Sequence, residues 1–414
     1  MVGFRRIMRL LFVIDNLGSG GAQRQMANLA LELSRRGHTV ELFVYYPQYN
    51  HFVGLLEEAG ILIHSRPKRG RFSLVPIFEL RRLAKGRHYD AMLAFLPTPS
   101  FYAEMAHMRI RGMPLVVSER FMYTRESLPP ATWVLQQAHR LADHVTVNSH
   151  HQRERMERVF PWMRGRLTTI YNGVDLARFA PQGDSSGYSG RLRLLVLSSV
   201  VPKKNPVGLV RAFARYRELY GDTCTVRWAG QVTSDPVSRK EFAEADRLLS
   251  ELGLRDQWEW LGERKDIPEL LGSCDALIHP SFYEGLPNAI CEALACGKPV
   301  LASAVCDHPR LVQEEVTGFL FDPGNADDIA RAIHKCRLLS VEGRERMGRK
   351  ARQYAESELS LDNCGRRYEE LLSRLTEGNS FRNCGEGSGK ATVAGPFLCR
   401  AQERDRGRSV KRKC

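Results

Sequence analysis

Short apolar runs alternate with amphipathic stretches along most of the chain. The first run covers residues 9–14, and after it Met26, Leu29, Ala30 and Leu33 recur at the i, i+3, i+4, i+7 spacing of a helix over residues 22–36. Further short apolar runs predict buried strands with helices between them, and these runs are residues 40–45, 61–65, 91–95, 115–118 and 144–148. The alternation predicts parallel β-α-β units in a doubly wound sheet.

The same alternation resumes after residues 183–190, whose Gly, Ser and Asp composition predicts a flexible linker. Predicted strands and helices again take turns along the chain. The strands are 192–198, 224–230, 259–261, 276–279 and 299–303, and the helices are 206–220, 238–252, 267–272 and 287–296. A single core stops growing at roughly 250–300 residues, so 414 residues favour two domains. We therefore expect one α/β domain over 1–185 and a second over 190–360.

The positive charge is concentrated outside the second domain. The net charge of +14 divides into +10 for residues 1–187, −2 for residues 188–377 and +6 for residues 378–414. This asymmetry is typical either of a solvated basic surface or of an anionic partner, such as phospholipid, nucleic acid or a phosphate-bearing substrate. Because residues 378–414 have few large apolar side chains, we expect a disordered basic tail there.

No apolar run approaches the roughly 18–20 residues of a membrane span. The apolar run near the amino terminus is interrupted by Asp15, and no small-x-small cleavage site follows it, so it predicts a strand rather than a signal peptide. We therefore expect a cytoplasmic chain that contacts a membrane at most peripherally.

The Gly18-Ser19-Gly20-Gly21 segment lies between a predicted strand and a predicted helix. Glycine lets backbone N–H groups approach a phosphate closely, and the helix dipole favours negative charge at that end. The segment is therefore either a phosphate-binding turn or a tight turn only.

The most informative segment runs from Pro280 to Val300 and reads PSFYEGLPNAICEALACGKPV. It joins a strand to a helix, so the backbone between Gly285 and Asn288 lies where an α/β sheet binds phosphate. Glu284 is in the loop, free to reach a sugar. Glu292 leans back toward the helix start and offers two acceptor oxygens to a ribose diol. The alternative is that Glu284 only stabilises the helix start and that Glu292 is a surface residue.

Two further loops offer charged side chains. Lys203 and Lys204 follow the first strand of the second domain and could neutralise a diphosphate, or could simply be solvated. Glu119 and Arg120 follow Ser118 at the end of a strand of the first domain, so we expect them to face the interdomain cleft. The alternative is that Glu119 and Arg120 form a structural ion pair.

Several other activities lack their motifs. The chain contains no G-x-x-x-x-G-K-[ST] and no H-E-x-x-H, and its one G-x-S-x-G match, residues 183–187, falls in the predicted linker and not at a strand-to-helix turn. It also contains no Asp-x-Asp, which disfavours a metal-dependent glycosyltransferase, and we expect no metal site and no cofactor.

Taken together, these motifs make the chain similar to the retaining glycosyltransferases of family four, which have the GT-B fold. The resemblance covers about residues 10–375. Its motifs are Gly20-Gly21, Tyr171-Asn172-Gly173-Val174-Asp175, Lys204-Asn205, Pro280-Ser281, the E-x7-E pair Glu284 and Glu292, Thr317-Gly318-Phe319 and Asp322-Pro323. It implies an α/β GT-B architecture, with two Rossmann-like doubly wound parallel-sheet domains facing a cleft. It also implies a last helix, over 361–377, that crosses back to the first domain.

The resemblance assigns roles to individual residues. Lys204 contacts the donor phosphates, Glu284 the transferred sugar and Glu292 the ribose, while Arg264 lies beside the base and Gly20 and Gly21 lie near the diphosphate. The candidate catalytic residues are Glu284, Glu119 and Lys204. The candidate donor-binding residues are Gly20, Gly21, Ser199, Lys203, Lys204, Arg264, Glu284, Gly285, Leu286, Pro287, Asn288 and Glu292.

The chain departs from the family at two places. Ser198 and Ser199 stand where many members have an arginine, so phosphate neutralisation rests on Lys203 and Lys204. Glu119-Arg120 stands where many members have a histidine, which resembles the Ser-Glu-Arg version of transferases that build surface polysaccharides and lipid-linked oligosaccharides.

The resulting hypothesis is a retaining transferase that uses a nucleotide-sugar, with UDP as the expected nucleotide, and a glycan or lipid-linked acceptor. We expect peripheral contact with an anionic membrane and no nucleic-acid partner. The alternatives are a nucleotide-sugar epimerase of the same fold and an inactive lipid- or nucleic-acid-binding scaffold.

Overall fold

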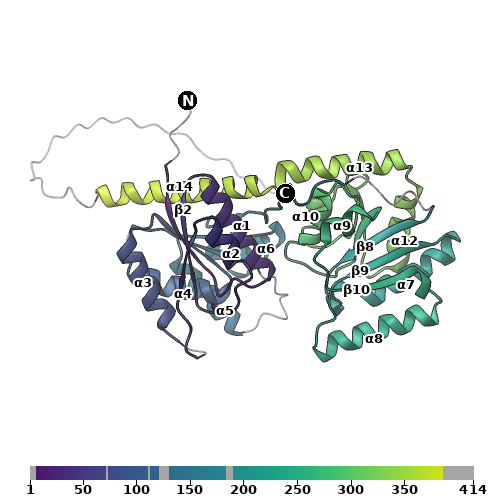
Figure 1. The fold of residues 1–414 in the computed structure, drawn as a ribbon, viewed down its shortest axis with the longest axis horizontal. Coiled ribbons are helices and arrows are strands. Elements are labelled where there is room, and N and C mark those ends of the chain that lie inside the picture. Colours follow the sequence, from purple (N-terminus) through teal and green to yellow (C-terminus); the bar gives the residue numbers. More distant parts are fainter. Residues whose placement is uncertain (1–5, 71–72, 111, 121–129, 183–189, 386–414) are drawn as a thin grey trace, which may run out of the picture.

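The chain folds into two lobes that are joined by a long helix (Figure 1). A computed structural model describes residues 6–70, 73–110, 112–120, 130–182 and 190–385. The expected linker at 183–190 falls almost entirely outside these residues, and so do residues 386–414 of the expected tail.

The first domain is built on a seven-stranded parallel sheet with the order β3-β2-β1-β4-β5-β6-β7. Along β1, Leu10 and Phe12 enter the core on one face of the sheet, while Leu11 and Val13 enter the core on the other. Both faces are covered, and this explains why the strand reads as a continuous apolar run. The strands are β1 (Arg9–Val13), β2 (Thr39–Val44), β3 (Leu62–Ser65), β4 (Ala91–Phe95), β5 (Leu115–Glu119), β6 (His144–Val147) and β7 (Leu167–Thr169), and the helices are α1 (Gly21–Arg35), α2 (Val53–Glu58), α3 (Val75–Arg87), α4 (Pro97–His107), α5 (Pro130–Gln137) and α6 (His150–Val159).

The second domain has a six-stranded parallel sheet with the order β10-β9-β8-β11-β12-β13. Alternate residues of β8 again divide between two cores, with Leu194 and Val196 in one and Leu195 in the other. The strands are β8 (Leu192–Leu197), β9 (Cys224–Ala229), β10 (Trp258–Gly262), β11 (Ala276–His279), β12 (Val300–Ser303) and β13 (Gly318–Phe321), and the helices are α7 (Pro206–Tyr220), α8 (Pro236–Glu251), α9 (Ile267–Gly272), α10 (Asn288–Ala295), α11 (His308–Leu311), α12 (Ala326–Leu338) and α13 (Val341–Tyr354).

Two doubly wound parallel sheets are what the apolar pattern predicted, so the predicted fold class is confirmed. Two edge strands were not predicted, and both are short. In β7 two of the three residues are threonines, which interrupts the apolar signal. In β13, Gly318 lies so close to β12 that an added Cβ would meet the Val300 carbonyl oxygen at 1.8 Å. A glycine there reflects close backbone approach, although in sequence it reads as a loop signal.

Helix α14 (Leu361–Gly385) leaves the second domain and lies along the first (Figure 1). Its Tyr368, Leu371 and Leu372 enter the first domain's core beside α1. The helix continues through Gly378, where we expected regular structure to end, so that boundary was wrong. A single glycine lowers helix propensity by about 1 kcal/mol, which does not by itself end a helix.

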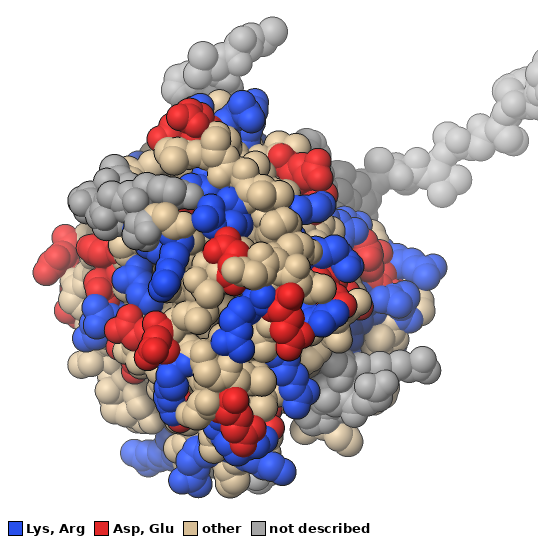
Figure 2. All heavy atoms as spheres, turned by 90° about the vertical axis from the view of Figure 1, so that its right-hand side faces the viewer, with Lys and Arg blue, Asp and Glu red and all other residues tan. Residues whose placement is uncertain are grey.

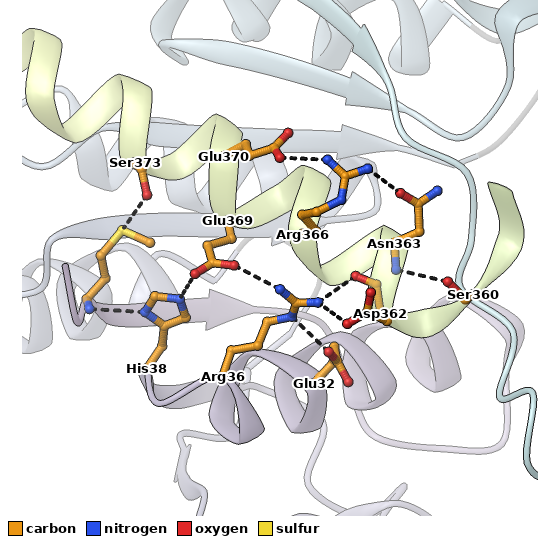
Figure 3. Close-up of polar contacts among 11 residues, drawn as sticks. Glu32, Arg36, His38, Ser360, Asp362, Asn363, Arg366, Glu369, Glu370 and Ser373 are labelled. Atoms are coloured by element: carbon orange, nitrogen blue, oxygen red, sulfur yellow. Dashed lines mark hydrogen bonds and ion pairs between the residues drawn. The ribbon is translucent and has the colours of Figure 1, made fainter. Parts of the chain in front are cut away.

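A polar network fastens α14 to α1 (Figure 3). The Arg36 guanidinium donates to Glu32 at 2.8 Å, to Glu369 at 3.0 Å and to the carboxylate of Asp362. The backbone N–H of Met8 donates to Nδ1 of His38, which leaves Nε2–H to donate to Glu369 at 3.2 Å. Because α14 also continues from the second domain, this network helps set how the two domains lie relative to each other.

Candidate functional site

The strand order of each sheet defines where its site lies. The order reverses between β1 and β4 in the first sheet and between β8 and β11 in the second. Ligands of doubly wound sheets bind at such switch points, outside the carboxyl ends of the strands. The loops that follow these strands are therefore the place to look for the predicted side chains.

Lys204 and Glu284 come together at the switch point of the second sheet. Lys204 ends a short 3-10 turn after β8, and its Nζ donates to the carboxylate of Glu284 in the loop after β11. Ser281 Oγ donates to the same carboxylate oxygen at 3.1 Å, and His279 Nε2 lies 3.4 Å from it. Asn205 adopts a left-handed conformation (φ 58°) and caps α7, which fixes where the turn ends.

Burial and pairing act oppositely on these groups. Burial lowers the pKa of Lys204, and the charge of Glu284 partly offsets this. Burial also acts to raise the pKa of Glu284, but the His279 hydrogen bond and the Lys204 charge outweigh it and hold that pKa well below its usual range. The pair therefore presents a buried ammonium beside a carboxylate that stays ionised.

Glu292 lines a cavity of about 270 Å³ in the second domain. The residue is 8% exposed, and burial raises the pKa of its carboxyl while the Arg24 charge opposes the rise. Arg24 belongs to α1 of the first domain and lies 2.7 Å from Glu292, so this ion pair crosses between the domains. Ser199 and Arg264 line the same cavity, and Arg264 is exposed and paired with Asp266.

A cavity of about 290 Å³ lies between the two domains. Asn288 lines both this cavity and the one around Glu292, and its Oδ1 accepts a hydrogen bond from Asn172 of the first domain at 2.8 Å. The two cavities therefore adjoin at the domain boundary. The interdomain cavity is lined by Gly21, Ala22, Gln25, Leu96, Arg120, Asn148, Asn172, Lys203, Tyr283, Glu284, Gly285, Leu286 and Asn288.

The loop before α10 contributes chiefly backbone. Leu286 is buried in the core of the second domain, and Pro287, at the N-cap, has no N–H to donate. Gly285 and Asn288 line the interdomain cavity. Across it, Gly21 begins α1 so close to Asn288 that an added Cβ would lie 3.6 Å from its Nδ2, while Gly20 is an exposed N-cap outside both cavities.

Glu119 does not face the interdomain cleft, so this prediction was wrong. The side chain is fully buried and accepts a hydrogen bond from His139 Nε2 at 3.0 Å. Along β5, Leu115 and Val117 point into one core, and Glu119 follows them at the next alternate position. The alternative, an ion pair between Glu119 and Arg120, does not form either, because Arg120 donates hydrogen bonds to Asn172 and Tyr368.

Several residues at or beside the site were not predicted, and three of them make contacts that bear on it: Arg24, His279 and Asp307. Asp307 accepts hydrogen bonds from the backbone N–H groups of His150 and His151, so a second-domain carboxylate caps α6 of the first domain. Arg24 has a usable signal, since it lies one turn after the Gly20-Gly21 loop on the same helix. The sequence indicates only that His279 ends a strand, and it carries no signal for the contact with Glu284.

Among the residues that the structure describes, no group of three or more His, Cys, Asp or Glu side chains could hold a metal ion. Within the same part of the chain, no helix is both long enough and apolar enough to cross a bilayer.

Two Rossmann-like domains with facing strand ends, and a site divided between them, define a GT-B type of protein. The family model described as "Glycosyltransferase Family 4" matches residues 19–178, and the one described as "Glycosyl transferases group 1" matches residues 184–354. The first model covers most of the first domain and the second covers most of the second domain, so the chain belongs to the glycosyltransferases that combine these two domains. The predicted resemblance is confirmed.

Curated relatives carry glycosyltransferase names. A D-inositol 3-phosphate glycosyltransferase of Saccharomonospora viridis is 24% identical over 82% of this chain and 85% of its own length. The UDP-Gal:alpha-D-GlcNAc-diphosphoundecaprenol alpha-1,3-galactosyltransferase of Escherichia coli is 29% identical over 41% of this chain and 44% of its own length. The chain thus spans less than half the length of several of the curated relatives it matches.

Solved structures share the fold. A glycosyltransferase from Rickettsia africae superposes with a TM-score of 0.76 at 19% identity, covering 89% of this chain and 98% of that one. The Anabaena protein HepE, solved in complex with UDP, gives a TM-score of 0.74 at 22% identity, covering 89% of this chain and 100% of that one.

Proposed function

We propose that this protein moves a sugar from a UDP-sugar to a glycan or lipid-linked acceptor, with retention of anomeric configuration and without a metal ion. The observation that carries the proposal is the pair of adjoining cavities. One is lined by the buried Glu292 carboxylate, suited to a ribose diol. The other is lined by Glu284, whose carboxylate accepts a hydrogen bond from Lys204. Relatives and neighbours whose names contain UDP, diphosphoundecaprenol and inositol phosphate support this choice of substrates.

The chemistry assigns a task to each side chain. The bond between the anomeric carbon and the diphosphate oxygen breaks while an acceptor hydroxyl attacks from the same face, and the departing phosphate takes the hydroxyl proton. Negative charge grows on the diphosphate, and the buried Lys204 ammonium stabilises it strongly because little water competes there. Glu284 accepts hydrogen bonds from the sugar hydroxyls, and Glu292 from the ribose. The transferred sugar is a hexose or an N-acetylhexosamine, and the product belongs to a surface polysaccharide, lipopolysaccharide or glycolipid.

Thermal unfolding with UDP, GDP, ADP and CMP tests the donor site. A nucleotide at one hundred times its Kd stabilises the folded state by about 2.7 kcal/mol. We expect UDP to raise the Tm of the wild type, and Glu292→Ala to weaken UDP binding about tenfold to a hundredfold, because two charge-assisted hydrogen bonds are lost. Arg24→Met is the matched control: it removes the ion pair but keeps the carboxylate, so it should bind UDP at least as tightly as wild type. Near-wild-type UDP affinity in Glu292→Ala would contradict the ribose assignment.

The proposal includes peripheral contact between the first domain and an anionic membrane. Arg66 and Arg69 are exposed in the loop before α3, and Phe78 on α3 is 61% exposed. On the end of the second domain, by contrast, acidic and basic side chains are interspersed (Figure 2).

Sedimentation with vesicles containing phosphatidylglycerol tests this contact. We expect binding at low salt and release at high salt, because surface charges are screened. Each basic residue near the surface is worth about 1 kcal/mol, so Arg69→Gln should weaken binding about fivefold. Arg247→Gln, on exposed helix α8 of the second domain, should leave it unchanged. No sedimentation of wild type at low salt would refute membrane contact.

A further inference from the structure

Arg120 is a cation that lines the interdomain cavity, and the donor chemistry proposed above assigns it no role. It follows β5 directly, and its guanidinium carbon lies 3.6 Å from the centre of the Phe95 ring. Nη1 donates to Asn172 Oδ1 at 2.6 Å, and Nη2 donates to the Tyr368 hydroxyl at 3.1 Å. The supports come from the end of β4, from the segment after β7 and from α14, so the side chain is held from three directions.

None of the residues that the structure describes neutralises the charge of Arg120. All three of its supports are neutral groups, and the neighbouring carboxylate, Glu119, turns away to His139. No described carboxylate lies within ion-pair distance of Arg120, whereas Arg24 and Lys204 at the same site are both paired. Placing an unpaired cation in a partly buried cavity costs free energy unless an anion arrives to offset it.

Two polar atoms of the cavity wall also lack hydrogen-bond partners within the described part of the chain. Arg120 Nε is buried without a hydrogen-bond acceptor, and Asn148 Oδ1 is buried without a donor. Asn148 is 5% exposed and lines the same cavity from the end of β6. The wall therefore offers a guanidinium to an anion and an amide oxygen to a hydroxyl, both already positioned.

We propose that Arg120 binds a phosphate group of a substrate in the interdomain cavity, with Asn148 accepting a hydrogen bond from a hydroxyl of the same substrate. A planar guanidinium held on a ring and by two neutral acceptors suits a tetrahedral oxyanion. The inference rests on the proposed function. The phosphate has two possible sources: the donor diphosphate, or a phosphate on the acceptor next to the sugar that is extended.

Binding measurements on the full chain separate the two sources. The probes are UDP, uridine and, with UDP saturating, N-acetylglucosamine 1-phosphate and unphosphorylated N-acetylglucosamine. If Arg120 binds the acceptor phosphate, Arg120→Gln weakens binding of the sugar phosphate to the UDP complex by about tenfold to a hundredfold and leaves UDP and the neutral sugar unchanged. If it binds the donor diphosphate, the same variant weakens UDP by a similar factor and leaves uridine unchanged.

Two further variants distinguish anion binding from a structural role. Arg120→Lys keeps the charge and should retain part of the phosphate preference, whereas Tyr368→Phe removes one support and should retain nearly all of it. Unchanged affinity of Arg120→Gln for both phosphorylated probes would overturn the inference. A second result would also overturn it: the wild type binds the phosphorylated and the neutral sugar with equal affinity and binds UDP no more tightly than uridine. This second measurement uses the wild type alone, so it does not depend on a variant that folds. Failure of wild type to bind UDP at all would instead count against the proposed function.

Discussion

Lys204→Met is expected to lower kcat by about a hundredfold to a thousandfold, the usual loss when one preorganised donor to a developing negative charge is removed. Methionine keeps the side chain as far as its Cε but carries no charge. It therefore removes the cation that we propose meets the departing diphosphate, and it leaves the partly buried Glu284 without its partner. Release of UDP from a UDP-sugar in the presence of acceptor measures the effect.

Lys203→Met is the matched comparison for this prediction. Lys203 is adjacent in sequence and lines the interdomain cavity, but its side chain is exposed, with the ammonium 5.9 Å from the Tyr283 ring centre. Water screens an exposed charge, so we expect a loss of tenfold or less. Equal losses in the two variants would contradict the distinct role assigned to Lys204.

The same lysine gives kcat a pH dependence. Burial lowers the pKa of Lys204 below the ordinary lysine value, so the ammonium is lost at a lower pH than that of a solvated lysine. We expect kcat to fall as pH rises through this lowered pKa. Glu284 stays ionised through the neutral range, since its own pKa is held well below the usual value.

Much of the site could be predicted because neighbouring strands of a parallel sheet end at the same edge, so the loops that follow them lie together. Once β8 and β11 are recognised as neighbouring strands, their carboxyl ends must lie together, and Lys204 and Glu284 belong to the loops that follow them. Glu292 follows from helix geometry, one to two turns into α10.

Contacts between the domains could not be predicted in the same way. The Arg24–Glu292 pair and the capping of α6 by Asp307 depend on how two separate sheets are placed, and no local pattern encodes that placement. Glu119 is a different case. Its burial was readable, because it continues the alternate positions of Leu115 and Val117, but a charged residue at a strand end is ordinarily assigned to the surface.

The burial of Glu119 leads to the second large effect, which is on stability. His139 is fully buried between two carboxylates, with Nδ1 2.6 Å from Glu104 and Nε2 3.0 Å from Glu119. Burial opposes the charged imidazolium, but the hydrogen bonds to Glu104 and Glu119 outweigh it and raise the pKa of His139 to about 9. Burial also raises the pKa of Glu104, and its hydrogen bond to the imidazole opposes the rise. One cation therefore lies between two buried carboxyl groups inside the first domain.

His139→Leu is expected to lower the free energy of unfolding by roughly 3–5 kcal/mol, because it leaves buried carboxylates without a cation. Urea unfolding of the wild type and the variant, followed on the first domain, measures the loss. Adding Glu104→Gln to His139→Leu should recover part of it, since one of the two unpaired charges is then removed. A loss below about 1 kcal/mol, the range of ordinary surface changes, would show that the imidazole carries no charge there.

The pH dependence of unfolding tests that charge directly. A folded pKa of about 9 against an ordinary 6.5 means that the contribution of His139 is fully present below pH 6.5 and is lost as pH rises through 9. Between these values the folded state holds one more proton than the unfolded state, so the free energy of unfolding falls by up to about 1.4 kcal/mol per pH unit. In His139→Leu this slope should be absent, and a slope that survives in the variant would assign the proton to another group.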